Sequence, residues 1–256
     1  MIKKHLITCS VMFVLVIISR FAISDLAVSK PITFAPENST KFIFTNITKT
    51  RPGNGYNFAN EALPVNDVKV NNKLRHSIKQ HNYLSIQSNV LQFKALKLFP
   101  VIEPILKLYG IPEDFKYIPL VESGLCAGVS PKGAAGIWQF MPGTARTYGL
   151  KVGKGIDERM NVRKSTIAAC KYIKELYGEF NSWTLAAAAY NNGEIKLQKQ
   201  IKKQDENNYF RMHLNRETGV YVYNLIAMKE IISKPVSYGF KPVYAHTQIS
   251  EFLAYN

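Results

Sequence analysis

A short apolar stretch that ends in a carboxylate and a glycine constrains the fold of this chain most strongly. Pro112 suits the first turn of a helix, and Glu113 and Asp114 complement the positive N-terminal end of a helix. Apolar residues then recur at the spacing of a mostly buried helix: Phe115, Ile118, Leu120 and Val121. Gly124 is a typical helix stop, which places Glu122 in the last turn.

The position of Glu122 favours a raised pKa. The C-terminal end of a helix disfavours a negative charge and apolar neighbours disfavour it further, so both raise the pKa of a carboxyl group there. A group that protonates a leaving-group oxygen near neutral pH needs such a pKa. From spacing alone, a surface glutamate at a frayed helix end is an equally good interpretation. Glu122 is therefore a candidate general acid.

The composition indicates a folded and strongly basic protein. The 256 residues have room for one domain with a sizeable core and an N-terminal extension, and the hydrophobic content of 46% argues against a disordered chain. The formal net charge of +15 indicates an anionic partner or environment, or it serves solubility alone. No recognition-helix, zinc-ligand or RNA-binding aromatic motif occurs, so we expect no nucleic-acid partner and favour association with a negatively charged cell envelope or membrane.

The first residues have the pattern of an export signal. Lys3 and Lys4 precede an apolar core over 6–18 that is too short for a comfortable membrane span. Small residues suited to signal peptidase follow. We predict a signal peptide or an N-terminal anchor over residues 1–24, and localisation in the periplasm or cell envelope, with membrane anchoring if the segment is retained.

The rest of the chain divides by composition and periodicity. Residues 25–72 are rich in polar residues and have poor periodicity, which indicates an irregular N-terminal segment. Helical spacing then predominates and strand alternation is nearly absent, so we predict a mainly α domain over 73–240 and a tail over 241–256. The predicted helices are an early pair marked by Leu84, Val90, Leu91, Phe93, Leu96 and Leu98, and helices over 101–109, 165–180, 183–190 and 221–232.

Four motifs occur in a fixed order along the predicted domain. They are ESG at 122–124, SPKGAAGIWQFMPGTA at 130–145, AAAAYNNG at 186–193 and RETGVYV at 216–222. This ordered set resembles the lytic transglycosylases with a goose-type-lysozyme-like catalytic domain, the SLT domain of glycoside hydrolase family 23, and most of all the membrane-bound lytic murein transglycosylase D type. The resemblance covers about residues 73–240 and implies a lysozyme-like helical fold.

The resemblance implies a reaction as well as a fold. Ordinary glycosidases use two carboxyl groups, and no second acid stands in the Glu122 motif. The family cleaves the β-1,4 bond between N-acetylmuramic acid and N-acetylglucosamine in peptidoglycan glycan strands without water. The resemblance implies that Glu122 protonates the glycosidic oxygen while the acetamido carbonyl of the muramic acid attacks C1. The carboxylate then takes the proton of the C6 hydroxyl, which gives a 1,6-anhydromuramoyl end.

Three residues of the second motif are implied to face the substrate. Ser130 resembles the hydroxyl that orients the acid or contacts the acetamido group, and an ordinary Ser-Pro turn is the alternative. Gln139 and Met141 resemble a pair that lines the cleft as polar contact and apolar wall. The alternatives are a solvated helix start for Gln139 and core packing for Met141.

The last two motifs supply the other implied substrate-binding residues. Tyr190 resembles a phenol that hydrogen-bonds the catalytic carboxyl group, with Asn191 presenting its amide to sugar. A plain core residue is the alternative for Tyr190. Glu217 resembles a second carboxylate that contacts substrate, with Tyr221 behind it. A helix N-terminal glutamate is the alternative for Glu217.

Two other functions stay open. A hydrolytic muramidase would cleave the same bond with water and needs a second carboxylate, for which Glu217 is the candidate. A non-catalytic cell-wall-binding protein would not need the acid of the first motif. We expect no cofactor and no metal site, because the five histidines form no ligand-like cluster. Cys126 and Cys170 could form a disulfide in an oxidising compartment or remain two free thiols.

Overall fold

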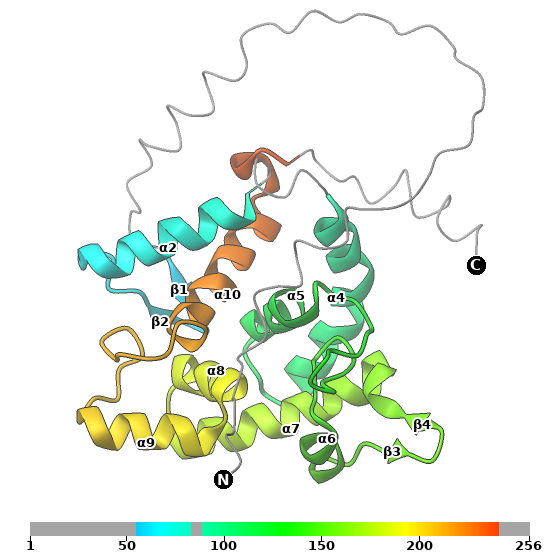
Figure 1. The fold of residues 1–256 in the computed structure, drawn as a ribbon. Coiled ribbons are helices and arrows are strands. Elements are labelled where there is room, and N and C mark those ends of the chain that lie inside the picture. Colours follow the sequence, from blue (N-terminus) through cyan, green and yellow to red (C-terminus); the bar gives the residue numbers. More distant parts are fainter. Residues whose placement is uncertain (1–54, 83–88, 241–256) are drawn as a thin grey trace, which may run out of the picture. The chain divides into compact units, whose positions relative to one another are not determined.

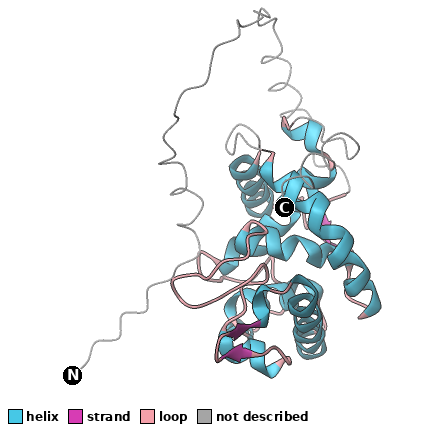
Figure 2. Cartoon of the chain, turned by 90° about the vertical axis from the view of Figure 1, so that its right-hand side faces the viewer, coloured by secondary structure: helices cyan, strands magenta, loops and turns pink. Residues whose placement is uncertain are grey.

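Helices make up most of the described part of the chain, as Figure 2 shows, and this confirms the predicted mainly α fold. The computed structural model describes residues 55–82 and 89–240. These residues belong to one unit that begins at Gly55. The predicted export segment at 1–24 and the predicted tail at 241–256 lie outside the described residues. Within the described ranges, no helix combines the length and apolar character needed to cross a membrane.

The elements follow one another in the order seen in Figure 1. The first are β1 (Asn57–Phe58), β2 (Glu61–Ala62), α2 (Val68–His81) and α4 (Val90–Leu108). The next are the 3-10 turn η1 (Glu113–Tyr117), α5 (Ile118–Ser123), α6 (Pro142–Thr147), β3 (Val152–Gly153), β4 (Ile156–Asp157) and the 3-10 turn η2 (Glu158–Met160). The last are α7 (Val162–Phe180), α8 (Trp183–Asn192), α9 (Glu194–Gln204), α10 (Thr218–Ser233) and the 3-10 turn η3 (Pro235–Tyr238). The strands pair as two antiparallel hairpins, β1 with β2 and β3 with β4.

Helix α10 lies at the centre of the packing. It contacts α2, α8, α5 and η1, while α7 packs against α4 and α8. A helix that is surrounded on several sides must be mostly apolar, and the buried residues of α10 include Val222, Leu225, Ile226 and Ile231. The indole of Trp138 is fully buried in the same core, and its Nε1–H donates to Thr166 Oγ1 at 2.9 Å.

Helix α8 begins at Trp183, as predicted, and continues past the predicted end at Tyr190 to Asn192. The Ser182 hydroxyl accepts from the Leu185 N–H at 3.3 Å and so caps α8, and the helix ends before Gly193, which has φ of +84°. Helix α7 begins at Val162, earlier than predicted, because the Asn161 side chain accepts from the Lys164 N–H and caps it there.

Helix α4 is one continuous helix, whereas two separate elements were predicted over its length. Pro100 and Pro104 lie inside it and lack the N–H that an interior helical residue donates. The buried side chains of Ile102 and Ile105 hold the second half in the core, so tertiary packing outweighs the two missing hydrogen bonds. The predicted contribution of Leu84 lies outside the described residues.

The ordered unit extends further toward the N-terminus than the predicted boundary at Lys73. Both strands of the first hairpin and the start of α2 fall in the segment that was predicted to be irregular. Phe58 of β1 is fully buried, and its ring centroid lies 5.0 Å from that of Phe115. Strands of two residues are too short to give a period of two, so the sequence offers no strand signal here.

The carboxylate of Glu61 caps helix α8 from a distant part of the sequence. It accepts hydrogen bonds from the backbone N–H groups of Trp183 and Thr184. It also accepts from the hydroxyl groups of Ser182 at 2.9 Å and Thr184 at 2.7 Å. A negative charge at a helix N-terminus is favoured by the helix dipole. Glu61 therefore ties the first hairpin to the helix that carries Tyr190.

A second carboxylate, that of Asp114, ties the same hairpin to α10. Its Oδ2 accepts from the Ala59 N–H at 2.7 Å and from Lys229 Nζ at 2.7 Å. Lys229 also donates to the side chain of Asn57 at 2.9 Å. Asp114 was predicted only to complement the helix N-terminus, and its distant partners could not be read from the sequence.

Replacing Glu61 tests the importance of the long-range cap. We expect Glu61→Ala to lower the free energy of unfolding by about 2 kcal/mol, because it leaves donors at the start of α8 without partners. Urea unfolding followed by circular dichroism measures the change. Glu179→Ala on the exposed face of α7 is the control and should change stability by less than about 0.5 kcal/mol. Equal losses in the two variants would contradict the capping role.

Candidate active site

Glu122 lies in the last turn of α5, as predicted. Gly124 ends the helix in the left-handed region with φ of +57°, and its N–H donates to Leu120 O at 3.0 Å. The predicted helix before it is divided into η1 and α5, with Pro119 near the start of α5. Glu122 is half-buried as a residue, and its carboxyl group is surrounded by protein.

The phenol that contacts Glu122 is that of Tyr221. Its OH donates to Glu122 Oε1 at 2.6 Å from the buried side of α10. The resemblance implied this contact for Tyr190, and the structure corrects that assignment. The Tyr190 OH donates instead to Trp138 O at 2.8 Å. Tyr190 nevertheless lies near Glu122. Desolvation is the largest cause of the raised pKa of the Tyr190 phenol, and the negative charge of Glu122 is the next.

The surroundings of Glu122 raise its pKa to about 7. Desolvation by the surrounding protein is the largest cause. The hydrogen bond from Tyr221 lowers the pKa, and the charge of Glu217 raises it. A pKa near 7 lets the carboxyl group both donate and accept a proton at neutral pH, and the sequence predicted the raised pKa from the helix end and the apolar neighbours together.

Glu217 and Asn191 meet beside this carboxyl group. The Asn191 Nδ2–H donates to Glu217 Oε1 at 2.9 Å, and the Thr218 hydroxyl donates to Asn191 Oδ1 at 2.9 Å. These two bonds fix which way the amide points. Glu217 stands immediately before the first residue of α10, at the helix N-terminus that the alternative predicted, and its contact with substrate stays a prediction.

Ser130 closes a turn. Its hydroxyl accepts from the Ala134 N–H at 3.0 Å, and its N–H donates to Ala134 O at 2.7 Å. Among the hydrogen bonds of the described residues, none joins Ser130 to Glu122, and the structure shows the Ser-Pro turn that was the alternative. Ser123 directly follows Glu122 in the sequence. Its hydroxyl donates to Ile137 O at 2.9 Å and so joins the end of α5 to the second motif.

Gln139 and Met141 lie on the loop that follows this turn. Gln139 has φ of +47°, and its amide donates to Gly136 O at 2.8 Å, so it is not a solvated helix start. Met141 is 46% exposed, which excludes the alternative of core packing. Substrate contact by Gln139 and Met141 stays a prediction.

A buried arginine that the sequence reasoning missed supports this loop. Arg159 is 5% exposed, and its Nη1 donates to Gly133 O at 2.7 Å and to Phe140 O at 2.8 Å. Its Nε and Nη2 donate to the two carboxylate oxygens of Asp157. The guanidinium therefore holds both ends of the small-residue segment. No spacing rule links residue 159 to that segment, so only the surrounding Gly-rich sequence hinted that something must brace it.

Gly136 shows why the second motif is rich in small residues. It has φ of +75°, and a Cβ there would lie 1.9 Å from Arg159 O. In the structure it lets the loop approach the protein's own backbone at Arg159.

Cys126 and Cys170 are both free thiols in the structure. Cys126 is exposed in the loop after α5, where Lys94 Nζ lies 2.6 Å from its sulfur. Cys170 is fully buried in α7, and desolvation raises its pKa to about 12. The disulfide alternative is therefore not realised.

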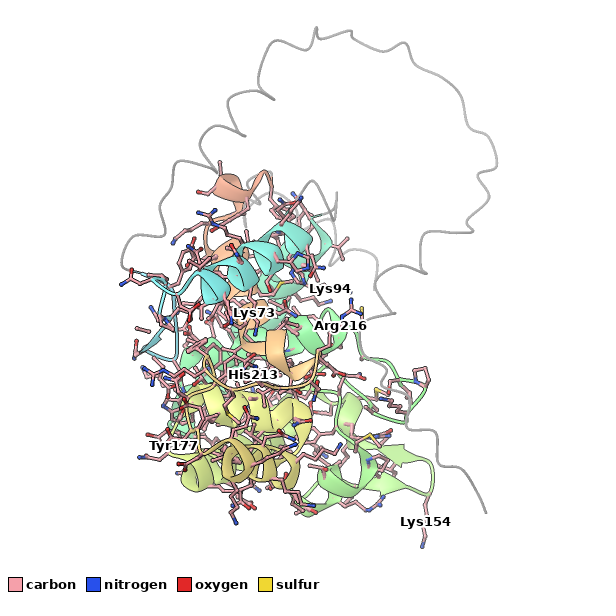
Figure 3. All side chains as sticks on the ribbon, turned by 60° about the vertical axis from the view of Figure 1, so that its left-hand side comes forward. Lys73, Lys94, Lys154, Tyr177, His213 and Arg216 are labelled. Atoms are coloured by element: carbon pink, nitrogen blue, oxygen red, sulfur yellow. The ribbon has the colours of Figure 1, made fainter. Side chains whose placement is uncertain are left out.

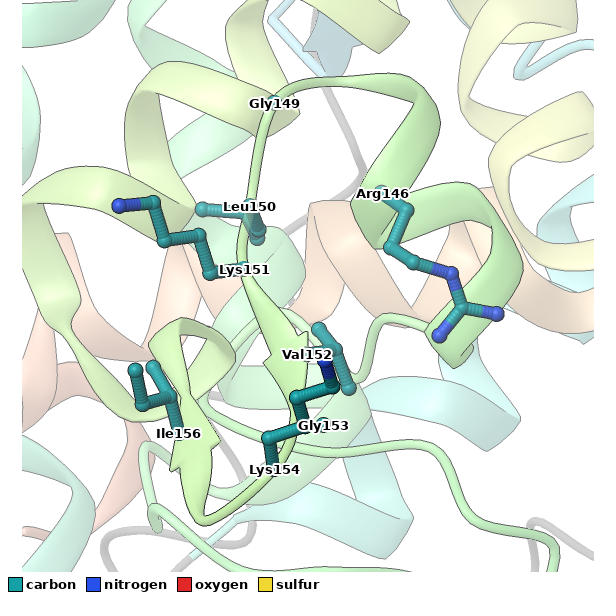
Figure 4. Close-up of a pocket in the computed structure, with 8 residues that line it drawn as sticks. All are labelled: Arg146, Gly149, Leu150, Lys151, Val152, Gly153, Lys154 and Ile156. Atoms are coloured by element: carbon teal, nitrogen blue, oxygen red, sulfur yellow. The ribbon is translucent and has the colours of Figure 1, made fainter.

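A separate hollow of about 530 Å³ lies beside the β3–β4 hairpin (Figure 4). It is lined by Arg146, Gly149, Leu150, Lys151, Val152, Gly153, Lys154 and Ile156. None of these residues carries a carboxyl or hydroxyl group, so the hollow has no counterpart of Glu122. Figure 3 shows Lys154 projecting at this edge, while Lys94 and Arg216 lie elsewhere on the domain.

The comparisons with known proteins agree with this site. Residues 101–212 match the family model of the transglycosylase SLT domain. Over 142 residues the chain is 34% identical to the membrane-bound lytic murein transglycosylase D of Escherichia coli K12. The aligned region covers 53% of this chain and 31% of that protein. Over 70 residues the chain is 41% identical to the peptidoglycan transglycosylase gp16 of Escherichia phage T7. This aligned region covers 27% of the chain and 5% of that protein.

The matched region contains Glu122 and Tyr190 but ends before Glu217. The chain spans about a third of the length of the E. coli relative that it matches. In sequence over residues 101–212, and in its helical fold, this part of the molecule is similar to the transglycosylase SLT domain.

The Tyr221 hydrogen bond can be tested by titration. Because this bond lowers the pKa of Glu122, we expect Tyr221→Phe to raise that pKa further above about 7. Carbon-13 NMR of the labelled carboxyl group measures the shift. Tyr190→Phe removes a phenol that bonds a backbone carbonyl instead, so its effect should be smaller. The assignment fails if the Tyr190 variant gives the larger change.

The raised pKa of Glu122 also predicts how stability depends on pH. The carboxyl group titrates near 4.5 in the unfolded chain and near 7 in the folded one, so between these values the folded state binds more protons. Stability should therefore fall as pH rises through this window. We expect Glu122→Gln to exceed the wild type by on the order of 2 kcal/mol at pH 8 and to match it below pH about 4. Urea unfolding at several pH values checks this, and a difference that does not depend on pH would contradict it.

Proposed function

We propose that this chain is a peptidoglycan lytic transglycosylase that cleaves the β-1,4 bond between N-acetylmuramic acid and N-acetylglucosamine. The observation that carries the proposal is the Glu122 carboxyl group, which lies within the region that matches the SLT domain, has a pKa near 7 and is held by Tyr221. The printed names of two relatives support it, since one is a lytic murein transglycosylase and the other a peptidoglycan transglycosylase.

The proposed reaction uses one protein carboxyl group twice. Protonated Glu122 donates its proton to the glycosidic oxygen as the C1–O bond breaks, and the acetamido carbonyl oxygen of the muramic acid bonds to C1. The Glu122 carboxylate next takes the proton of the C6 hydroxyl, and the C6 oxygen displaces the acetamido oxygen at C1. A 1,6-anhydro ring forms, no water is consumed, and Glu122 regains its proton. A pKa near 7 suits both steps, because neither protonation state is strongly favoured at neutral pH.

The neighbours of Glu122 have distinct parts in this proposal. Tyr221 stabilises the carboxylate that forms after the first proton transfer, since it donates directly to Oε1. Glu217 supplies negative charge near the positive charge that develops on the sugar ring. Asn191, fixed by Thr218, holds Glu217 in place and offers polar contact to sugar.

A hydrolytic muramidase is the second candidate function. The presence of Glu217 in the same site favours it, because a hydrolase needs a carboxylate that orients water. Glu217 Oε1 already accepts from Asn191, which leaves the other oxygen for such a water. The two candidates therefore differ in the chemical form of the product and not in the residues involved.

The cellular location is part of the proposal. We place the protein in the cell envelope, exported and held at the membrane by its N-terminal segment. The apolar pattern after Lys3 and Lys4, the net charge of +15 and the words membrane-bound in the name of the E. coli relative support this placement.

Digestion of peptidoglycan sacculi separates the candidate functions. Mass spectrometry of the released fragments should show 1,6-anhydromuramoyl ends with the wild-type chain. Glu122→Gln should lower their release by at least about 100-fold, because it removes the proton that is transferred. Glu217→Gln is the matched control at the same site and should retain anhydro products at a reduced rate. Fragments with free reducing ends would establish the hydrolytic function. If the wild-type chain released no fragments, both enzymatic functions would be contradicted.

A further inference from the structure

A second cavity lies between α4 and the C-terminal end of α10. Its volume is about 310 Å³, which is at the lower end of the range for small-molecule sites. It is lined by Gln92, Ala95, Leu96, Phe99, Pro100, Glu103, Ile232 and Pro235. The lining is thus mostly apolar, with one amide and one carboxylate.

The cavity is far from the acid. Tyr221 lies near the start of α10 and Ile232 near its end (Figure 1). At 1.5 Å per residue, these two positions are about 16 Å apart along the helix. None of the lining residues is a hydrogen-bond partner of Glu122, so the cavity is not part of the site described above.

One wall of the cavity is a regular stripe along α4. Gln92, Leu96, Phe99 and Glu103 recur at intervals of four, three and four residues, which places them on the same face of the helix. Leu96 is 44% exposed although it is apolar. Ile232 and Pro235 form the opposite wall.

The amide of Gln92 has no partner in this wall. The residue is 5% exposed, and both Oε1 and Nε2 are buried without a hydrogen bond. Asn71, Tyr223 and Asn224 each have one buried side-chain oxygen without a hydrogen bond, whereas Gln92 lacks a partner for both its donor and its acceptor. Leaving a buried donor and acceptor unpaired is costly, and such groups in native proteins call for an explanation. A ligand that brings its own acceptor and donor would satisfy both atoms.

The chemistry of the lining defines that ligand. Oε1 needs an N–H donor and Nε2 needs an oxygen acceptor beside it, while the walls favour small apolar groups. An N-acetyl amino sugar presents an acetamido N–H next to the oxygen on C3, together with a methyl group. A residue of an extended peptide also presents an N–H and a carbonyl on one side. The Glu103 carboxylate at the edge is paired with Lys116 Nζ through Oε1 at 2.7 Å, and its other oxygen can accept from a sugar hydroxyl.

We propose that this cavity is a second, non-catalytic binding site for an N-acetyl amino sugar of a glycan strand, with Gln92 as the residue that recognises the acetamido group. The inference rests on the proposed function, because peptidoglycan is the source of such sugars. A strand held here would keep the enzyme on the polymer and raise the local concentration of cleavable bonds.

NMR titration of the full chain carrying Glu122→Gln tests the proposal without substrate turnover. The side-chain amide of Gln92 reports on the cavity, and that of Asn191 reports on the candidate active site. Tetra-N-acetylchitotetraose should shift the Gln92 resonance, whereas the de-N-acetylated tetramer should not. A shift of Asn191 without a shift of Gln92 would overturn the second site and leave the proposed function intact. A shift of Gln92 alone would support the second site and count against the proposed function.

The other probe is a stem pentapeptide that is composed of alanine, glutamate and lysine residues. No shift of Gln92 with this peptide supports the assignment to an amino sugar. A shift with the peptide but not with the sugar overturns it. These measurements keep Gln92 in place, so they do not depend on the folding of a variant.

A variant provides an independent test on the polymer. Gln92→Leu, added to the Glu122→Gln chain, should reduce the amount of protein that sediments with sacculi several-fold. It should also raise the Tm, because it removes the buried unpaired amide. Gln198→Leu on exposed α9 is the matched control and should leave sedimentation unchanged. Unchanged sedimentation of the Gln92 variant, or an equal loss in the control, would overturn the proposal.

Discussion

The burial of α10 is the constraint on which the rest of the described structure depends. Because this helix lies between α2, α8 and α5, its position determines where several polar groups meet. Tyr221 near its start reaches Glu122, and Lys229 in its last turns reaches Asp114 and the first hairpin. Its end forms one wall of the second cavity. A single apolar element thus places the acid's partner, anchors the N-terminal hairpin and shapes a distant surface.

Charged side chains then fix the loops that the apolar core leaves free. The Gly/Ala-rich segment after α5 buries Ile137, Trp138 and Phe140 in the core, and hydrogen bonds to its backbone carbonyls hold the rest of it. Arg159, oriented by Asp157, donates to carbonyls at both ends of that segment. Glu61 fixes the start of α8 by accepting from the backbone N–H groups of Trp183 and Thr184. In both cases a buried or half-buried charge is paired with several hydrogen-bond partners, which is the condition under which burial of a charge is tolerated.

Part of this site could be predicted from the sequence because it depends on local chemistry. The glycine after an apolar run defined the end of α5, and the helix end together with the apolar neighbours predicted a raised pKa for Glu122. The choice between two tyrosines could not be predicted. Tyr190 and Tyr221 both follow apolar stretches, and only the packing of α8 and α10 decides which hydroxyl reaches the acid and which reaches Trp138.

The sequence by itself determined the helical class and the raised pKa of Glu122, because periodicity, helix position and apolar neighbours act within a few residues of each other. Only the tertiary structure decided the partner of the acid, the support of the Gly-rich loop by Arg159 and the cavity at Gln92. These features join residues that are far apart in the chain. The physical reason is that hydrogen bonds and desolvation depend on distances in space, which a pattern along one chain does not contain.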